Sequence, residues 1–378
     1  MKKSTIYADH AATTALSPRA LDAMTPFLTD DYTNPSTLYH SPHVSRRAVA
    51  SARERIADCI GASPEEVHFT SCGTEADNWA LKGIAFQHFN QRKRIITSAI
   101  EHHAILRSCD FLRRVGCEIL YLPVDSCGIV SPDALKSAMT KESALLVSVM
   151  MANNEIGTIE PVSQLADIAH CYGALFHTDA VQAVGHISVN VREQGVDMLS
   201  ASAHKFNGPK GVGFLYVRKG IAIESLLHGG GQEMGLRAGT ENVAGLVGMA
   251  AALSEHMETL DKDRQQLELL RASLLSRLKD SGIRFLVYGS ENHIPGSLSL
   301  SFYHAEGEMI LHRLDLMGIA IATGSACNSK ENVLSHVIKA IDVPESYAHG
   351  TIRITLGMDN NEEQVTEIAN ALIQVLNK

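Results

Sequence analysis

One stretch decides how we interpret the fold: Ser200-Ala201-Ser202-Ala203-His204-Lys205-Phe206-Asn207-Gly208-Pro209-Lys210-Gly211. The residues before it, 196–202, have the pattern of a short buried strand, and 213–217 have the pattern of another. Lys205 is therefore expected in a tight turn, rich in glycine and proline, between two strands. In a partly dry pocket a lysine loses its charge readily and can form a Schiff base with an aldehyde. The alternative is a solvated lysine in an ordinary turn.

A carboxylate upstream favours the first interpretation. Asp179 closes an apolar strand in the stretch Ala174-Leu175-Phe176-His177-Thr178-Asp179-Ala180-Val181-Gln182. In that place it could face a pyridine nitrogen and keep it protonated, so that the ring accepts electrons. An amine and a carboxylate of this kind are what pyridoxal 5'-phosphate requires of a protein.

Strands alternate with helices along the first two thirds of the chain, which predicts an α/β fold with a mostly parallel sheet. Polar candidates follow several of the strands, namely Thr74, His102, Asn154 and Asp179. Ligand groups collect at the carboxyl ends of parallel strands, so these residues are expected to meet. Gly73 and Thr74 also lie in a turn of small residues, 71–75, between a strand and a helix expected over 76–86, whose free N–H groups suit a phosphate.

Composition narrows the class of protein. The chain has 378 residues, enough for two domains, and a formal net charge of -9, which argues against nucleic acid or an anionic membrane surface as partner. No stretch approaches the length of a membrane span, and the start leads into a strand instead of a secretory signal. Seven cysteines lack any Cys-x-x-Cys pair, so we expect neither a disulfide framework nor a metal site, mostly small buried thiols, and a cytoplasmic location.

The motifs resemble a known family as a set. An Asp-Ala-x-Gln run, followed by Ser-x-His-Lys before a Gly-Pro-Lys-Gly turn, resembles the class V aminotransferases, a group that includes the cysteine desulfurases. The resemblance implies the type I fold of pyridoxal-phosphate enzymes, with a mostly parallel seven-stranded sheet. It also implies a large cofactor-binding domain over 15–257 and a smaller α+β domain over 258–378 together with 1–14.

The resemblance also assigns the site. It implies that the cofactor is bound by Gly73, Thr74, His102, Asn154, Asp179, Gln182, Ser202, His204, Lys205 and Thr240. His102 would stack on the ring and share proton transfer with Lys205, and Asn154 would reach the phenolic oxygen. Thr240 of one subunit would reach the phosphate of the other, which implies a homodimer. Asn34 and Arg353 would hold the substrate carboxylate.

A further stretch, Ala322-Thr323-Gly324-Ser325-Ala326-Cys327-Asn328-Ser329-Lys330, matches the Gly-Ser-Ala-Cys loop of group I cysteine desulfurases, the type used in nitrogen fixation and iron–sulfur assembly. Small residues around a cysteine leave its sulfur exposed. The resemblance implies that Cys327 attacks the sulfur of L-cysteine, keeps it as a persulfide, releases alanine and passes the sulfur to an acceptor protein. An iron–sulfur contact at Cys327 would be transient and follows from the family alone.

Two alternatives remain open at this point. A selenocysteine lyase or a transaminase would keep Lys205 and Asp179 without depending on Cys327 for sulfur transfer. A sulfur-relay scaffold without catalysis would not hold the cofactor covalently. The sequence also departs from the family at Tyr39, Pro42 and Cys72, of which we expect Cys72 to be a packed thiol.

Overall fold

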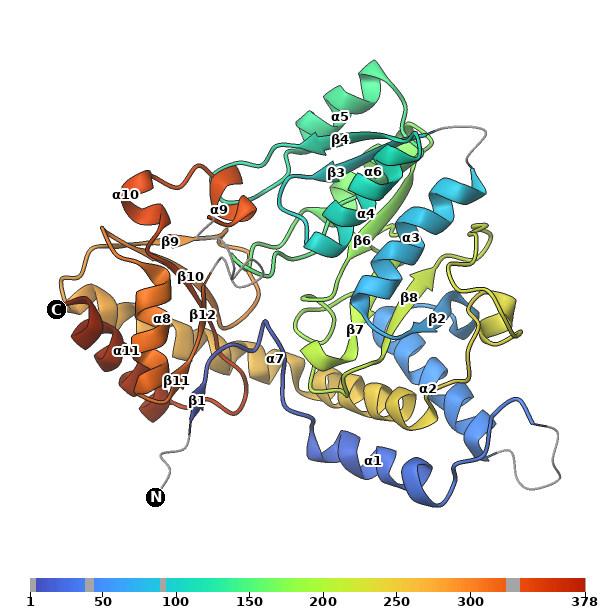
Figure 1. Cartoon of the computed structure of the whole chain (residues 1–378), viewed down its shortest axis with the longest axis horizontal. Coiled ribbons are helices and arrows are strands. Elements are labelled where there is room, and N and C mark those ends of the chain that lie inside the picture. The colour runs from blue at the N-terminus through green and yellow to red at the C-terminus, as the bar shows by residue number, and fades with distance from the viewer. Residues whose placement is uncertain (1–4, 38–43, 89–92, 324–333, 378) are drawn as a thin grey trace.

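The computed structural model describes residues 5–37, 44–88, 93–323 and 334–377 (Figure 1). Its helices are α1 (Pro18–Thr29), α2 (Val44–Ile60), α3 (Gly73–Gln87), α4 (His103–Arg114), α5 (Pro132–Lys141), α6 (Val162–Cys171), α7 (Val243–Asp280), α8 (Gly307–Leu316), α9 (His336–Ala340), α10 (Glu345–Ala348) and α11 (Glu362–Leu376). Within these described residues, no helix combines the length and the apolar character needed to cross a membrane.

The strands form a large sheet and two smaller ones. They are β1 (Ile6–Tyr7), β2 (Val67–Thr70), β3 (Arg94–Ser98), β4 (Glu118–Leu122), β5 (Leu146–Ser148), β6 (Leu175–Asp179), β7 (Met198–Ser202), β8 (Gly213–Val217), β9 (Phe285–Tyr288), β10 (Ser297–Phe302), β11 (Ile319–Ala320), β12 (Ala322–Thr323) and β13 (Thr351–Thr355). In the described part of the chain the large sheet has seven strands in the order β2-β8-β7-β6-β5-β3-β4. Only β8 runs against its neighbours. The predicted mostly parallel α/β sheet is confirmed.

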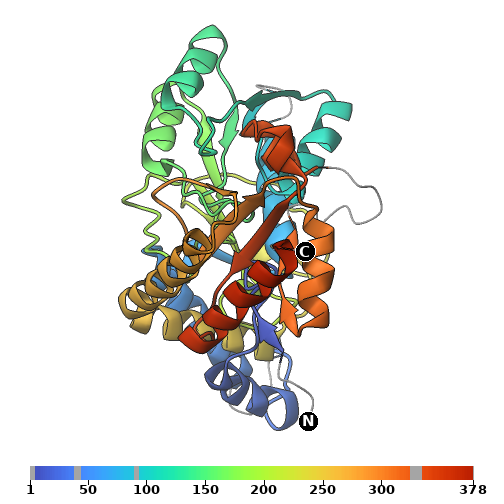
Figure 2. The same cartoon turned by 90° about the vertical axis from the view of Figure 1, so that its left-hand side faces the viewer.

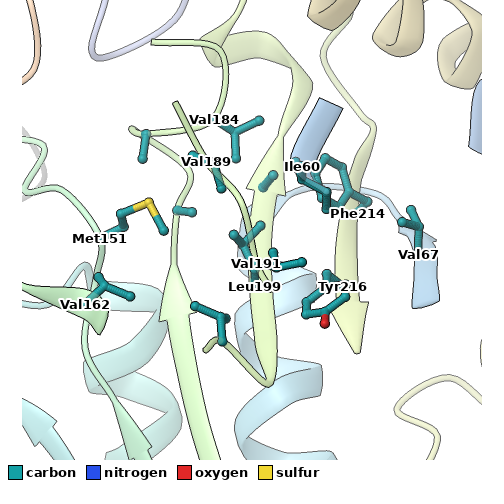
Figure 3. Close-up of a cluster of buried hydrophobic side chains, with 14 of the residues drawn as sticks. Ile60, Val67, Met151, Val162, Val184, Val189, Val191, Leu199, Phe214 and Tyr216 are labelled. Atoms are coloured by element: carbon teal, nitrogen blue, oxygen red, sulfur yellow. The ribbon is translucent and has the colours of Figure 1, made fainter. Parts of the chain in front are cut away.

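Helices cover both faces of this sheet because consecutive strand residues point to opposite sides. Ile96, Val147, Leu199 and Phe214 pack with α2, α5, α6 and the first half of α7, a cluster that Figure 3 shows in part. Their neighbours Ile95, Leu146, Met198 and Leu215 pack on the other face with α3 and α4. Strands buried on both faces therefore read as the continuous apolar runs seen in the sequence.

A second body contains the antiparallel sheet β12-β13-β10-β9 and the two-stranded pair β1-β11. Its core draws on Ile6 and Ala8, on α8 and α11, and on Leu267, Leu270, Leu274 and Leu278 in the second half of α7. It faces the viewer in Figure 2, with the red helix α11 near the C-terminus. Helix α7 joins the two bodies (Figure 1). The separate cores support the division we propose at residue 257.

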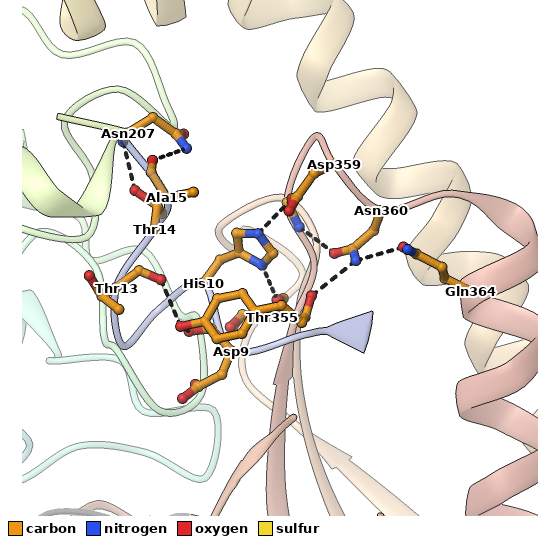
Figure 4. Close-up of polar contacts among 12 residues, drawn as sticks. Asp9, His10, Thr13, Thr14, Ala15, Asn207, Thr355, Asp359, Asn360 and Gln364 are labelled. Carbon is orange, nitrogen blue, oxygen red and sulfur yellow. Dashed lines mark hydrogen bonds and ion pairs between the residues drawn. The ribbon is translucent and has the colours of Figure 1, made fainter. Parts of the chain in front are cut away.

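The N-terminal segment ties the second body to the turn that holds Lys205. β1 pairs with β11, and the ring nitrogens of His10 bond to the Thr355 carbonyl at 2.9 Å and to Asp359 at 2.7 Å (Figure 4). The Oγ1 of Thr14 accepts the Asn207 N–H at 2.8 Å. Residues 9–14 thus lie against both bodies.

Apolar runs in the sequence predict strands over 118–124, 145–152, 196–202 and 319–323, and the structure differs from each of them. The run 196–202 is a strand only from Met198, where β7 begins. The run 319–323 divides into β11 and β12, which join different sheets. The run 145–152 is regular only at Leu146–Ser148, because the Met150 N–H turns to the Glu101 carboxylate. The run 118–124 ends as a strand at Leu122.

Candidate active site

A cavity of about 390 Å³ lies at the carboxyl ends of the parallel strands. Strands β2, β3, β5, β6 and β7 all run in the same direction, so the segments that follow them converge there. The predicted site residues that line the cavity are Gly73, Thr74, His102, Asn154, Asp179, Gln182, Ser202, His204, Lys205 and Arg353. Residues distributed over 280 positions of the chain are therefore brought together as the strand-end rule predicts.

Lys205 closes the short 3-10 turn η2 (Ala203–Lys205) between β7 and β8. Its Nζ donates to the backbone carbonyls of Ala11, at 2.6 Å, and Ala12, at 2.8 Å. The side-chain amide of Gln182 donates to the same Ala11 carbonyl at 2.9 Å. The N-terminal segment therefore aims the amine into the cavity, where it can meet an aldehyde.

Asp179 ends β6 with its side chain buried, and one of its oxygens accepts the Val181 N–H at 3.0 Å. Burial raises the pKa of Asp179, although the charges of His102 and Lys205 and the bond from Val181 oppose the rise. A ring nitrogen brought to this carboxylate would keep a proton, because the site is dry and the charge is close.

His102 caps helix α4. The Ala104 N–H donates to its Nδ1 at 3.1 Å, so Nδ1 is an acceptor and the neutral ring carries its proton on Nε2. Burial lowers the pKa of His102, with the charge of Asp179 acting in the opposite direction and that of Lys205 in the same one. The imidazole is thus suited to exchange a proton as a neutral base.

Asp77 was not predicted as a site residue. It belongs to α3, lines the cavity and is 1% exposed. One side-chain atom each of Asp77, His102 and Asp179 lie within 4.8 Å of one another. At that separation two carboxylates repel by roughly 3 kcal/mol with an effective dielectric constant of about 20. Burial and the charge of Asp179 accordingly hold the pKa of Asp77 well above its usual range.

The start of α3 offers an anion site. Cys72 occupies the N-cap position without a side-chain cap bond, so it leaves the first N–H groups of the helix for another partner. A Cβ at Gly73 would lie 2.5 Å from Val181, so only glycine allows the helix to start this close to the Asp179 loop. His204, which precedes Lys205 in the chain, also lines the cavity. Burial and the charge of Lys205 lower the pKa of His204 to about 4.

Arg353 enters the cavity from β13 of the second body. Its Nη2 donates to Asp9 at 2.6 Å, and its Nη1 donates to the Asn154 carbonyl at 2.8 Å. The Asp9 carboxylate shows that this guanidinium accepts a carboxylate partner in the cavity. Neither Asp9 nor Asp77 was predicted from the sequence as a site residue. The available signal for Asp9 was an acid among the small residues 8–12, and for Asp77 it was an acid on the apolar face of α3.

The remaining predicted residues lie elsewhere. Asn34 and Thr240 are exposed and do not line the cavity of the single chain. Asn34 accepts the Ser36 N–H at 2.9 Å in its own turn. Cys327, Tyr39 and Pro42 lie outside the described residues.

The other cysteines correct the expectation of mostly buried thiols. Among the six described, all free, Cys109 and Cys117 are buried, Cys171 is exposed and the rest are half-buried. Cys72 is not a packed core thiol, because it lines the cavity beside Gly73. This place at the cavity wall explains why its burial is only partial.

Comparison with known proteins identifies the family. The model for the class-V aminotransferases matches residues 6–368. The chain belongs to the class-V aminotransferase family. The cysteine desulfurase IscS of Dictyoglomus turgidum is 49% identical over 377 residues, which cover 100% of this chain and 95% of the relative. The cysteine desulfurase IscS of Methanosarcina thermophila is 43% identical and covers 99% and 92%.

Solved structures of the family have the same fold. A NifS-like protein superposes with a TM-score of 0.93 at 38% identity, and the match covers 99% of both chains. A structure of SspA in complex with cysteine superposes with a TM-score of 0.83 at 33% identity and covers 93% of this chain and 99% of the other. The resemblance stated from the sequence is confirmed, and the type I fold with it.

Class-V members are pyridoxal-phosphate-dependent enzymes, and this chain is one of them. The residues present fit that cofactor. Ser202 Oγ is buried at the cavity wall and has no hydrogen-bond partner among the described residues, as expected of a hydroxyl that awaits a phosphate oxygen. Ser202 and the uncapped start of α3 both line the cavity and could bind the phosphate of the cofactor. Asp179 and His102 line it as well and could contact the ring of the cofactor and its nitrogen.

Proposed function

We propose that the protein is a cysteine desulfurase that takes sulfur from L-cysteine, releases L-alanine and keeps the sulfur as a persulfide on Cys327 for acceptor proteins. The observation that carries the proposal is the convergence of Lys205, Asp179, His102 and Arg353 on one cavity. The relatives named cysteine desulfurase support it.

The bound cofactor supplies an aldehyde that joins amines covalently and a ring that accepts electron density from the substrate. Ser202, Thr74 and the first N–H groups of α3 would bind its phosphate, with Gly73 leaving room for it. Asp179 would hold a proton at the ring nitrogen. Asn154 and Gln182 would contact the ring oxygen, and His204 would support the turn through its 3.1 Å bond to Thr13.

Lys205 and His102 would move protons at the substrate carbon, with His102 acting through Nε2. Arg353 would hold the substrate carboxylate, which would replace or share the position of Asp9, and Asn34 would assist. The Cys327 thiolate would then attack the substrate sulfur. The carbon–sulfur bond breaks, the sulfur stays on Cys327, and the carbon fragment takes up a proton to become alanine.

The flanks of the Cys327 segment support its place in this reaction. Ala322, shortly before it, is the register partner of Arg353. Ser335, shortly after it, donates to Glu155 at 2.6 Å, and the His336 ring contacts the Glu101 carbonyl at 2.9 Å, next to His102. Both ends of the segment are thus fastened beside the cavity.

A homodimer with shared sites is part of the proposal. Arg237 forms two bonds with Glu75 of α3, at 2.8 and 3.0 Å, and this fastens the segment before Thr240 to the helix that begins the phosphate site. Thr240 itself is exposed and available to a second subunit. Free thiols throughout the described residues support the proposed cytoplasmic location.

The test combines borohydride trapping with mass spectrometry. Reduction with cofactor bound should label Lys205, and in a separate sample that has not been reduced L-cysteine should add one sulfur atom to Cys327. Cys327→Ala should abolish both the persulfide and alanine release, whereas the control Cys171→Ala, which removes an exposed thiol, should keep both. Trapping without sulfur on Cys327 would favour a selenocysteine lyase or a transaminase, and absence of trapping would favour the scaffold.

A further inference from the structure

Asp77 is a buried acid inside the cavity for which the reaction described above has no use. It lies one turn into α3 from Gly73, and one of its oxygens, Oδ1, is fully buried without a hydrogen-bond partner in the part of the chain that the structure describes. The acid groups of Asp77 and Asp179 lie within 4.8 Å of each other and of the His102 ring. A charged Asp77 would therefore be a second anion in the same dry space.

No cation among the described neighbours would balance that second charge. The Asp77 carboxyl bonds to the Ser200 hydroxyl and lies 3.9 Å from His177 Nε2. His177 is held between the hydroxyls of Ser148, at 2.9 Å, and Ser200, at 3.0 Å, with no exposed surface. Burial lowers the pKa of His177 to about 3, so the ring is neutral at physiological pH.

The other titratable groups around Asp77 make ionisation harder still. Glu101 and Cys72 can only add negative charge, and Asp179 carries the charge that the ring nitrogen needs. Lys205 acts on Asp179 and His102. An isolated buried carboxylate is costly, and a buried acid that cannot find a cation keeps its proton instead.

We propose that Asp77 is a positioning residue that stays a neutral carboxylic acid, so that the Asp77–Asp179 pair carries a single negative charge placed on Asp179. The inference rests on the proposed function for what Asp179 does, but the protonation of Asp77 is a property of the protein alone. The cavity then contains two acids, but only Asp179 presents a negative charge to the ring nitrogen.

Infrared spectroscopy of the carboxylic acid C=O stretch tests this in the apoprotein and with cofactor. The wild type minus Asp77→Asn difference at neutral pH should show one lost carboxylic acid band in both forms. Glu101→Gln is the matched control, because it removes another buried acid and should leave the Asp77 band in place. A difference spectrum without a lost carboxylic acid band would mean that Asp77 is ionised, and the proposal would be overturned.

A second variant tests the shared charge without altering Asp77. In Asp179→Asn the repulsion is gone, so the Asp77 band should disappear at a pH lower by about one unit or more than in the wild type. An unchanged midpoint would overturn the pairing. Borohydride trapping at Lys205 is scored separately, so failure to bind the cofactor would count against the proposed function and leave the band test valid.

Discussion

Replacing Arg353 by lysine tests the proposed carboxylate contact with the smallest change of charge. In the structure the guanidinium donates from Nη2 to Asp9 and from Nη1 to the Asn154 carbonyl, with its side chain only 9% exposed. Lysine keeps the positive charge but cannot present two parallel N–H groups to a carboxylate. The variant therefore isolates the geometry of the fork from its charge.

The magnitude follows from one lost charge-assisted hydrogen bond. Such a bond to a charged group contributes about 1.5 to 3 kcal/mol, which corresponds to a loss of roughly 10- to 150-fold in kcat/KM. We expect the loss to appear mainly in KM, because the carboxylate is held both before and during the reaction.

Initial rates of alanine formation over a range of L-cysteine concentrations give kcat and KM separately. The matched control is Arg218→Lys, which alters an arginine paired with the buried Asp197 at 2.6 Å but away from the cavity. If Arg353→Lys stayed within twofold of the wild type, or if both variants lost activity equally, the assigned role of Arg353 would be refuted.

Two further predictions concern stability. Glu233 is buried and accepts two bonds of 2.7 Å from Arg53 and one of 2.8 Å from the Phe69 N–H, so Glu233→Ala should lower the free energy of unfolding by about 3–5 kcal/mol. In urea unfolding the exposed Arg19–Glu258 pair is the control, and equal losses for Glu233→Ala and Glu258→Ala would contradict this reasoning. Burial lowers the pKa of His68 to about 4. Between about pH 6.5 and 4 the unfolded chain therefore binds a proton at His68 that the native protein does not, and the free energy of unfolding falls as the pH drops through this range. In His68→Gln the free energy of unfolding, measured by urea unfolding at each pH, should fall less over the same range. An equal fall in the variant and the wild type would mean that His68 is charged in the native protein and would contradict this prediction.

The strand ends could be predicted from the sequence because each side chain follows an apolar run that is buried on both faces. Lys205 and Asp179 were recognised in this way. The sequence also predicts strands over 213–217 and 351–355, and β8 and β13 have these bounds. Direction followed from the helices between strands, since a crossover returns the chain to the same edge.

What could not be predicted depends on distant partners. Ile319 and Thr323 lie in one apolar run, yet β11 pairs with β1 while β12 pairs with β13. The division of the run into two strands is therefore decided by one partner strand more than 300 residues earlier in the chain and by another that follows later. β9 was missed because its middle residues Leu286 and Val287 are partly exposed at a sheet edge. Asp77 was missed because helical periodicity alone does not reveal that its neighbour in space is Asp179.

The pairing of β1 with β11 has a consequence for biosynthesis. The carbonyls of Ala11 and Ala12 hold the Lys205 amine, but the strand that carries them into place finds its partner only when residue 319 has left the ribosome. The large body can fold earlier, since domains generally form as units during translation. We therefore expect the large sheet to form first in the nascent chain, and the Lys205 amine to reach its final position only near the end of synthesis. Covalent binding of pyridoxal phosphate would then be delayed until the protein is nearly complete.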